Sequence, residues 1–303
     1  MIIAVFPGQG AQSPGFLAPW LELDGAADRL AAYSEWSGVD LVAAGTQWDA
    51  DRIRDTQVAQ PLIVAASLLS WNALADRSPV AGVAGHSVGE FAAAAAAGVL
   101  SEEDALRLVG IRGRAMAEAA AVEQTGMSAV IGGDEASVVA RLAELGLTPA
   151  NYNGGGQIVA AGSLGALASL AAEPVSGTRV IPLQVAGAFH TSSMSPAVDT
   201  LRTAASATDA SDPAITLWTN RDGSAVDSGV TYRDFLVEQV ASPVRWDLCM
   251  AAFADAAVTG IIELAPAGTL VGLAKRALRG TPAVAVKTPA DLASAAALIG
   301  ESA

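Results

Sequence analysis

The chain has 303 residues, of which 52% are hydrophobic, and it carries a formal net charge of −14 at pH 7. This length and apolar content suffice for a large buried core in one domain or two, whereas the acidic balance would repel a nucleic acid duplex. The mean hydropathy is +0.40, but the longest apolar run, Phe91–Leu100, is too short to span a bilayer. We therefore expect a globular protein that binds neither nucleic acid nor membranes.

The N-terminal residues favour a first strand rather than a signal peptide. Residues 2–6 are apolar, have no basic segment before them and run directly into the loop Pro7-Gly8-Gln9-Gly10-Ala11-Gln12. The single cysteine, Cys249, excludes an internal disulfide. Together these features predict a cytoplasmic protein.

The glycine-rich loop after this strand is a candidate ligand-binding segment. In an open α/β sheet, loops at the carboxyl ends of strands line the ligand crevice, so a backbone N–H here could point at a developing oxyanion. A nucleotide phosphate loop is the alternative, but residues 7–12 lack both the Walker lysine and the third glycine of the dinucleotide pattern.

A strand–turn–helix segment carries a candidate nucleophile. After a mostly helical stretch to about residue 76, Val80–Ala84 predicts a short buried strand and Val88–Ala97 predicts a helix. Between them, Gly85-His86-Ser87-Val88-Gly89 has the Gly-x-Ser-x-Gly pattern of a nucleophile elbow. Glycine is needed at both ends because a Cβ there would collide with the neighbouring strand or helix. With a base nearby, the Ser87 hydroxyl could attack a carbonyl carbon.

The chain contains two histidines, His86 and His190, as possible bases for Ser87. His86 adjoins the serine on the strand that enters the turn, where successive side chains diverge, so it is poorly placed to take the hydroxyl proton. We therefore interpret His190 as the base, in the order of serine before histidine that α/β-hydrolases have. The alternative is a structural histidine at a domain edge.

Arg112 stands out in the next helix, for which Ser101 is the expected N-cap. It falls on an apolar stripe made of Ala105, Leu108, Val109 and Met116. A buried arginine needs an anionic partner because an unpaired buried charge costs several kcal/mol. No acid of this helix is within reach. The partner is therefore either a distant Asp or Glu or a carboxylate on the substrate, which a guanidinium can bind through two parallel hydrogen bonds.

The hydrophobic pattern changes from residue 127 onward. We expect strands over Met127–Ile131, Thr148–Tyr152, Gln157–Ala161 and Thr178–Leu183, and helices over Glu135–Leu145 and Leu164–Ala172. The order β-α-β-β-α-β is that of a ferredoxin-like unit. Beyond residue 190 an α/β alternation resumes, with strands near 215–218, 261–264 and 283–286.

These patterns predict an α/β protein with an inserted small domain. The larger domain is expected to comprise residues 1–125 and 187–303, and the ferredoxin-like small domain residues 126–186.

As a set, these segments resemble malonyl-CoA:acyl carrier protein transacylases, the acyltransferases that load fatty-acid and polyketide synthesis. The resemblance covers almost the whole chain, from the Pro-Gly-Gln-Gly-Ala-Gln loop to Gly268-Thr269-Leu270-Val271-Gly272-Leu273, and includes Gly85-His86-Ser87-Val88-Gly89-Glu90 and Gly187-Ala188-Phe189-His190. It implies a hydrolase-like parallel-sheet core with a ferredoxin-like insert. It also implies ping-pong transfer of a malonyl group from malonyl-CoA to the phosphopantetheine thiol of acyl carrier protein, through a malonyl-serine intermediate.

The resemblance also implies roles for single residues. Ser87 would be acylated, His190 would be the base, and the backbone carbonyl of Gln239 would orient that histidine in place of the acid of a full triad. Arg112 would grip the malonyl carboxylate. The oxyanion hole would be formed by backbone N–H groups, those of Gln9 and Val88.

Two further side chains, Met116 and Phe189, are expected to contact the substrate. An aromatic ring before the histidine is similar to the malonyl-selective form of the family, because it would crowd the methyl branch of a methylmalonyl group. One methyl group is worth only about 1–3 kcal/mol of discrimination.

The implied partners are malonyl-CoA and acyl carrier protein, with coenzyme A thioester as substrate and neither a cofactor nor a metal; we expect a monomer. Because the carrier protein is acidic like this chain, docking needs a local basic patch, for which Lys275, Arg276 and Arg279 are candidates. A serine hydrolase or thioesterase acting on acyl-CoA or esters is the alternative activity, but it leaves Arg112 without a use. A scaffold or carrier-binding module without activity is the third hypothesis.

Overall fold

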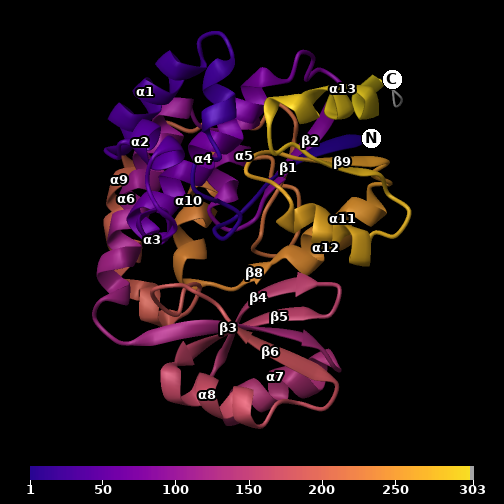
Figure 1. Ribbon diagram of the computed structural model, residues 1–303. Coiled ribbons are helices and arrows are strands. Elements are labelled where there is room, and N and C mark those ends of the chain that lie inside the picture. Colours follow the sequence, from indigo (N-terminus) through magenta and orange to yellow (C-terminus); the bar gives the residue numbers. More distant parts are fainter. Residues whose placement is uncertain (301–303) are drawn as a thin grey trace.

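Two five-stranded sheets organise residues 1–300, which are the residues that the computed structural model describes (Figure 1). The last three residues of the predicted 187–303 segment lie outside them. The first sheet has the order β10-β9-β1-β2-β7 and is parallel throughout. The second has the order β6-β3-β5-β4-β8 and is mixed. The predicted α/β class is therefore confirmed.

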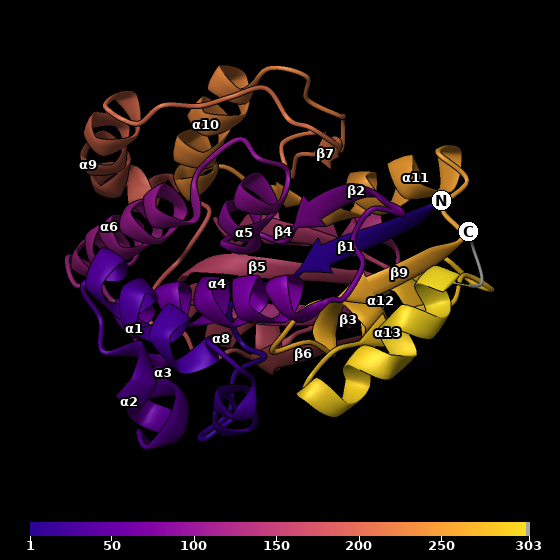
Figure 2. The same ribbon diagram turned by 90° about the horizontal axis from the view of Figure 1, so that it is seen from above.

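The first sheet consists of β1 (Ile2–Phe6), β2 (Val80–Gly85), β7 (Thr216–Trp218), β9 (Gly260–Glu263) and β10 (Ala283–Ala285). Its helices are α1 (Ala26–Ser37), α2 (Leu41–Thr46), α3 (Ala50–Arg54), α4 (Thr56–Ala73), α5 (Gly89–Ala96), α6 (Glu102–Ala120), α9 (Ser195–Ser206), α10 (Gly229–Glu238), α11 (Trp246–Asp255), α12 (Thr269–Ala277) and α13 (Leu292–Gly300). In both views α1–α3, α6 and α9 gather on the side opposite to α11–α13 (Figures 1 and 2).

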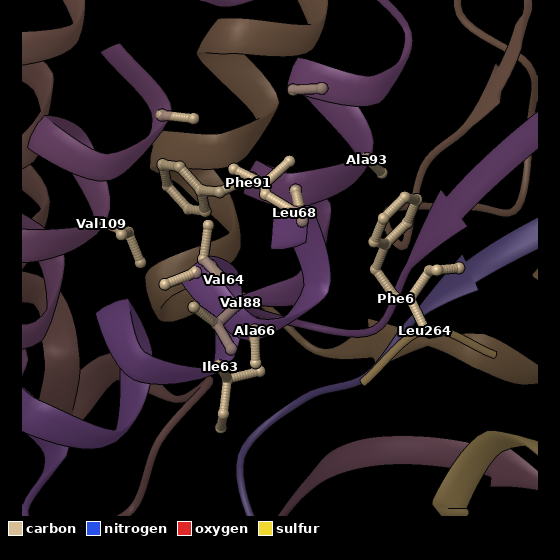
Figure 3. Packing of buried hydrophobic residues seen from close by; sticks show 14 of the residues in the cluster. Phe6, Ile63, Val64, Ala66, Leu68, Val88, Phe91, Ala93, Val109 and Leu264 are labelled. Carbon is tan, nitrogen blue, oxygen red and sulfur yellow. The ribbon is translucent and has the colours of Figure 1, made fainter. Parts of the chain in front are cut away.

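The central strand β1 is buried on both faces because its side chains alternate between two cores. Ile2, Ala4 and Phe6 belong to the larger core, which α4, α5 and α6 complete. Ile3 and Val5 belong to a second core with α11 and α12. Figure 3 shows the larger core, where Val88 and Phe91 lie beside Ile63, Val64 and Leu68 of α4 and Val109 of α6.

The parallel register brings two predicted loops together. Phe6 at the end of β1 pairs with Gly85 at the end of β2, so the glycine-rich loop and the turn at Ser87 leave the sheet side by side. The third neighbour, β9, ends in Glu263, whose buried carboxylate accepts hydrogen bonds from the backbone N–H groups of Gly268, Leu270 and Val271. This carboxylate fixes the start of α12 beside the same loops.

The second sheet consists of β3 (Thr125–Gly132), β4 (Thr148–Gly154), β5 (Gln157–Ser163), β6 (Thr178–Pro182) and β8 (Val244–Arg245), with α7 (Glu135–Glu144) and α8 (Leu164–Ala172). The two helices cover the face of the sheet that points away from the rest of the molecule (Figure 1). The predicted β-α-β-β-α-β order is present, with ends that differ by a few residues.

A strand not predicted from the sequence, β8, pairs in parallel with β4. It is only two residues long, so it has no period from which a strand could be predicted. Because β8 lies far outside residues 126–186, the second sheet is completed by another part of the chain. The proposed domain boundaries stay a prediction. No helix within residues 1–300 combines the length and the apolar character that crossing a membrane requires.

The turn around Ser87 can be tested through its glycines. A Cβ on Gly85 would lie 2.1 Å from the backbone N of Glu90, and one on Gly89 would lie 2.2 Å from the carbonyl O of Phe6. Both clashes are with backbone that cannot rotate away. We predict that Gly85→Ala lowers the free energy of unfolding by about 3 kcal/mol in urea titrations followed by circular dichroism. Gly165→Ala in α8, where a Cβ meets nothing within 4 Å, should instead be neutral or raise it by up to about 1 kcal/mol. Equal effects of the two changes would contradict this account of the turn.

Candidate active site

A cavity of about 210 Å³ opens where the loops of the first sheet face the second sheet. The first sheet contributes the turn after β2, the loop after β1 and residues of α4, α6 and α12, and the second contributes β3, β4 and β5. The predicted site residues that line it are Gln9, Ser87, Val88, Arg112, Met116, Phe189 and His190. Gln239 does not line this cavity. Its backbone carbonyl contacts His190, and its side chain contacts Arg112.

Ser87 sits on a sharp turn between β2 and α5. Its φ is 52°, a left-handed conformation that a residue with a Cβ adopts only when the surroundings hold it there. Asn220, in the loop after β7, helps to stabilise this conformation. Its Oδ1 accepts a hydrogen bond of 2.6 Å from the Ser87 N–H, and its Nδ2 donates one of 2.6 Å to the Gly85 carbonyl.

The Ser87 hydroxyl contacts the imidazole of His190. Ser87 Oγ and His190 Nε2 are 2.7 Å apart, and His190 Nδ1 is 2.8 Å from the backbone carbonyl of Gln239. Because a carbonyl can only accept, Nδ1 carries the proton and Nε2 presents its lone pair to the hydroxyl. Within residues 1–300 no carboxylate hydrogen-bonds to this histidine.

The His190 ring is only 4% exposed. Burial and the positive charge of Arg112 lower its pKa to about 3. The imidazole is therefore neutral at neutral pH and able to accept a proton. Like Ser87, His190 has a left-handed backbone, with a φ of 61°.

His86, the other histidine, points to a different partner. Its Nε2 lies 2.9 Å from Oδ1 of Asn153 on β4, and its ring stands edge-on to Trp246. His86 thus links the turn to the second sheet, and it makes no hydrogen bond to the Ser87 hydroxyl.

Two backbone N–H groups border the cavity near Ser87. Gln9 and Val88 both line it, and among residues 1–300 neither of their backbone N–H groups has a hydrogen-bond acceptor. The Gln9 side chain turns away, since its Nε2 donates to the carbonyl of Arg54 over 3.3 Å. Two free donors beside a hydroxyl provide a site that can stabilise an oxyanion.

Arg112 projects from α6 into the cavity wall and is only 1% exposed. Its Nη1 donates to Gln60 Oε1 over 2.6 Å and its Nη2 to Gln239 Oε1 over 2.8 Å, while its buried Nε has no partner. No carboxylate within the described part of the chain forms an ion pair with it. Burial lowers its pKa to about 10, so the group stays cationic at neutral pH.

The surroundings of Arg112 bear on the two alternatives for its partner. Glu90, which is distant from Arg112 in the helix pattern of the sequence, lies near it in space. The side-chain amide of Gln239 lies between the two charged groups. Neutral amide oxygens compensate a buried cation only in part. The guanidinium thus keeps donors free for an anion that enters the cavity.

The two remaining predicted contact residues, Met116 and Phe189, are both buried against the cavity. Met116 lies one turn after Arg112, and its sulfur is 3.4 Å from Gln60 Nε2. Phe189 precedes the histidine directly, so the fold that positions the base also positions this ring.

Three buried polar residues of the site were missed from the sequence: Gln60, Glu90 and Asn220. Glu90 is the single polar side chain of α5, and that interruption was a signal that could have singled it out, whereas α4 carries several other polar residues beside Gln60. Asn220 lies in a polar loop, where nothing distinguishes it from a turn residue. The described residues contain no group of three or more His, Cys, Asp or Glu side chains placed to hold a metal ion.

The basic residues Lys275, Arg276 and Arg279 are exposed at the carboxyl end of α12. The same helix lines the cavity with Thr269, Leu270 and Leu273. The cluster is therefore near the cavity, although its role in docking a carrier protein stays a prediction.

Comparison with known families and structures gives a consistent result. Residues 4–301 match the family model of the acyl transferase domain. The malonyl CoA-acyl carrier protein transacylase of Mycobacterium tuberculosis strain H37Rv is 55% identical over 296 residues, which are 96% of this chain and 98% of that protein. The protein of the same name from Escherichia coli K12 is 34% identical, over 96% of this chain and 97% of its own length.

Solved structures agree with the sequence matches. A crystal structure of the MCAT from Mycobacterium tuberculosis superposes with a TM-score of 0.93, at 54% identity, and covers 97% of this chain and 99% of its own. A malonyl-transacylase in complex with its type II PKS acyl-carrier protein gives a TM-score of 0.91 at 31% identity, with 97% of this chain and 98% of that one covered. The chain thus belongs to the acyl transferase family, among the malonyl CoA-acyl carrier protein transacylases.

Proposed function

We propose that this chain transfers a malonyl group from malonyl-CoA to the phosphopantetheine thiol of an acyl carrier protein, by way of a malonyl ester on Ser87. Its relatives carry the name of this activity. The observation that carries the proposal is the buried cation of Arg112, which shares a cavity with the Ser87–His190 pair and contacts no carboxylate of residues 1–300.

In the first half of the reaction Ser87 is acylated. Its Oγ attacks the thioester carbonyl carbon while the hydroxyl proton moves to His190 Nε2, 2.7 Å away. The carbon–sulfur bond then breaks, and the leaving coenzyme A thiolate takes the proton back from Nε2. The Gln239 carbonyl holds Nδ1–H through both transfers, so that the lone pair of Nε2 stays directed at the reacting atoms.

The tetrahedral intermediate places a negative charge on the former carbonyl oxygen. The backbone N–H groups of Gln9 and Val88 would hold this oxyanion, and each donor is worth about 3 kcal/mol by analogy with oxyanion holes elsewhere.

Arg112 would bind the free carboxylate of the malonyl group through its remaining donors. This contact has a second effect, because the charge of Arg112 is one of the causes that depress the pKa of His190. A carboxylate on the guanidinium offsets that charge. Malonyl binding thereby makes the imidazole more basic at the moment it must accept a proton.

In the second half the pantetheine thiol of the carrier protein attacks the malonyl ester. His190 takes the thiol proton and returns it to Ser87 Oγ as the ester bond breaks, which restores the free enzyme. The Phe189 ring, buried at the cavity wall, would disfavour a methyl branch on the acyl group, and Met116 would pack against the chain. The cytoplasmic location and the monomeric state stay predictions from the sequence.

Radiolabelled malonyl-CoA, added with and without acyl carrier protein, tests the proposed reaction. We predict a label on the protein that persists without the carrier, passes to the carrier when it is added, and is absent in Ser87→Ala. The reason is that the ester on Ser87 is the only covalent intermediate of the proposed route. Rapid release of free malonate would instead support the serine hydrolase alternative, and the absence of any label would support a scaffold without activity.

The role of Arg112 is tested by comparing two acyl groups. We predict that Arg112→Ala lowers kcat/KM for malonyl-CoA about a hundredfold, because two charged hydrogen bonds are lost. Acetyl-CoA has no carboxylate for Arg112, so its kcat/KM should fall far less. Arg107→Ala, a change on the same helix at a residue that pairs with Glu103 and Asp104 at the surface, serves as the control. An equal fall for both acyl groups would show that the assignment of Arg112 is wrong.

A further inference from the structure

Glu90 is a buried carboxylate that the proposed reaction does not use. It lies in the first turn of α5, three residues after Ser87, and is 1% exposed. Its Oε1 accepts a hydrogen bond of 2.6 Å from the backbone N–H of Asn220, and its Oε2 accepts one from Gln239 Nε2. Within residues 1–300 it forms no ion pair. A buried acid without a cation in contact is costly to keep, so it calls for a role.

The carboxylate determines which way the Gln239 side chain faces. One end of that amide is an acceptor and the other a donor. Its Oε1 accepts from Arg112 Nη2 over 2.8 Å, while its Nε2 donates to Glu90 Oε2 and, over 3.0 Å, to the Ser87 carbonyl. A flipped amide would set NH₂ against the guanidinium and an oxygen against the carboxylate. Only one orientation satisfies both neighbours.

Gln239 is also the residue that holds the base. Its backbone carbonyl accepts the hydrogen bond from His190 Nδ1. One residue therefore touches both groups on which malonyl transfer depends, and Glu90 fixes its side chain. A carboxylate in direct contact with Arg112 would neutralise it and compete with the substrate, whereas the intervening amide prevents that contact.

We propose that Glu90 is a positioning residue that sets the malonyl preference of the site, because it locks the Gln239 amide between itself and Arg112 and so leaves the remaining donors of Arg112 open to the substrate carboxylate. The inference rests on the proposed function of Arg112. Glu90 acts on the substrate through two other residues and touches no reacting atom.

Titration of Glu90 gives this role a signature. The charged and titratable groups near it are Arg112 on α6, the Tyr232 hydroxyl on α10 and the Cys249 thiol on α11. Burial raises the pKa of Tyr232 and of Cys249, so both stay neutral. Burial also raises the pKa of Glu90 to about 7. A protonated carboxyl has a hydroxyl in place of one acceptor oxygen, so it holds the Gln239 amide less well as the pH falls through that value.

The test compares Glu90→Gln with Glu118→Gln, the same change at an exposed position of α6. Pre-steady-state acylation of Ser87 is measured with malonyl-CoA and with acetyl-CoA at about one pH unit above and below the Glu90 pKa. We predict that Glu90→Gln lowers kcat/KM for malonyl-CoA about tenfold, mainly through KM, and changes that for acetyl-CoA by less than about twofold. The ratio of kcat/KM for malonyl-CoA to that for acetyl-CoA should decrease as the pH is lowered in the native protein and in Glu118→Gln. It should not change with pH in Glu90→Gln.

An equal loss for both acyl groups, or a pH-dependent ratio that persists in Glu90→Gln, would overturn the inference. If Glu90→Gln does not fold, the double variant that combines Glu90→Gln with Gln239→Glu tests the inference instead. There the hydrogen bonds from Asn220 and between positions 90 and 239 can form again, but a carboxylate now touches Arg112. We predict a folded protein that acylates with a low malonyl-to-acetyl ratio, and a native ratio would contradict the role of the intervening amide. Failure of the proposed role of Arg112 would be seen separately, as an equal effect of Arg112→Ala on both acyl groups. Failure of the proposed transfer would be seen as release of free malonate or as the absence of label.

Discussion

The guanidinium of Arg112 is held in the interior by neutral amide oxygens, and the rest of the site is arranged around that charge. Gln60 and Gln239 keep it in place without neutralising it, and Glu90 stays one amide away. The same constraint explains why a carbonyl stands behind His190. An aspartate in place of that carbonyl would add a second buried anion to a site that already contains Glu90. On the proposed function, the site holds His190 with a backbone carbonyl and reserves the cation of Arg112 for the substrate carboxylate.

The reacting groups lie on strained backbone, which the surrounding structure stabilises. Ser87 and His190 both have left-handed backbones, with φ of 52° and 61°, and such conformations persist only where the surroundings fix them. At Ser87 the surroundings are the close approach of Gly85 and Gly89 to neighbouring backbone and the two hydrogen bonds of the Asn220 side chain, which accepts from the Ser87 N–H and donates to the Gly85 carbonyl. Because Asn220 also donates its backbone N–H to Glu90, the turn that carries the nucleophile and the network that presents Arg112 form one buried polar system.

Much of this arrangement could be predicted because the signals were local. The apolar run of β1, the glycines around Ser87 and the stripe that contains Arg112 are each visible within a single element. Gln239 was found only through the family resemblance, since a backbone carbonyl leaves no trace in the side-chain pattern. β8, Asn220 and the link from Glu90 to Gln239 depend on which distant segments the fold brings together. Asn220 is 133 positions from Ser87, and Glu90 is 149 positions from Gln239, so no periodicity joins them.

The most direct measurement of the central claim is intact-protein and peptide mass spectrometry after a brief exposure to an equal mixture of malonyl-CoA and acetyl-CoA. If Arg112 is a cation reserved for the substrate carboxylate, the malonyl adduct should predominate and should map to the peptide that contains Ser87. Comparable amounts of acetyl and malonyl adduct, or an adduct on another residue, would contradict it.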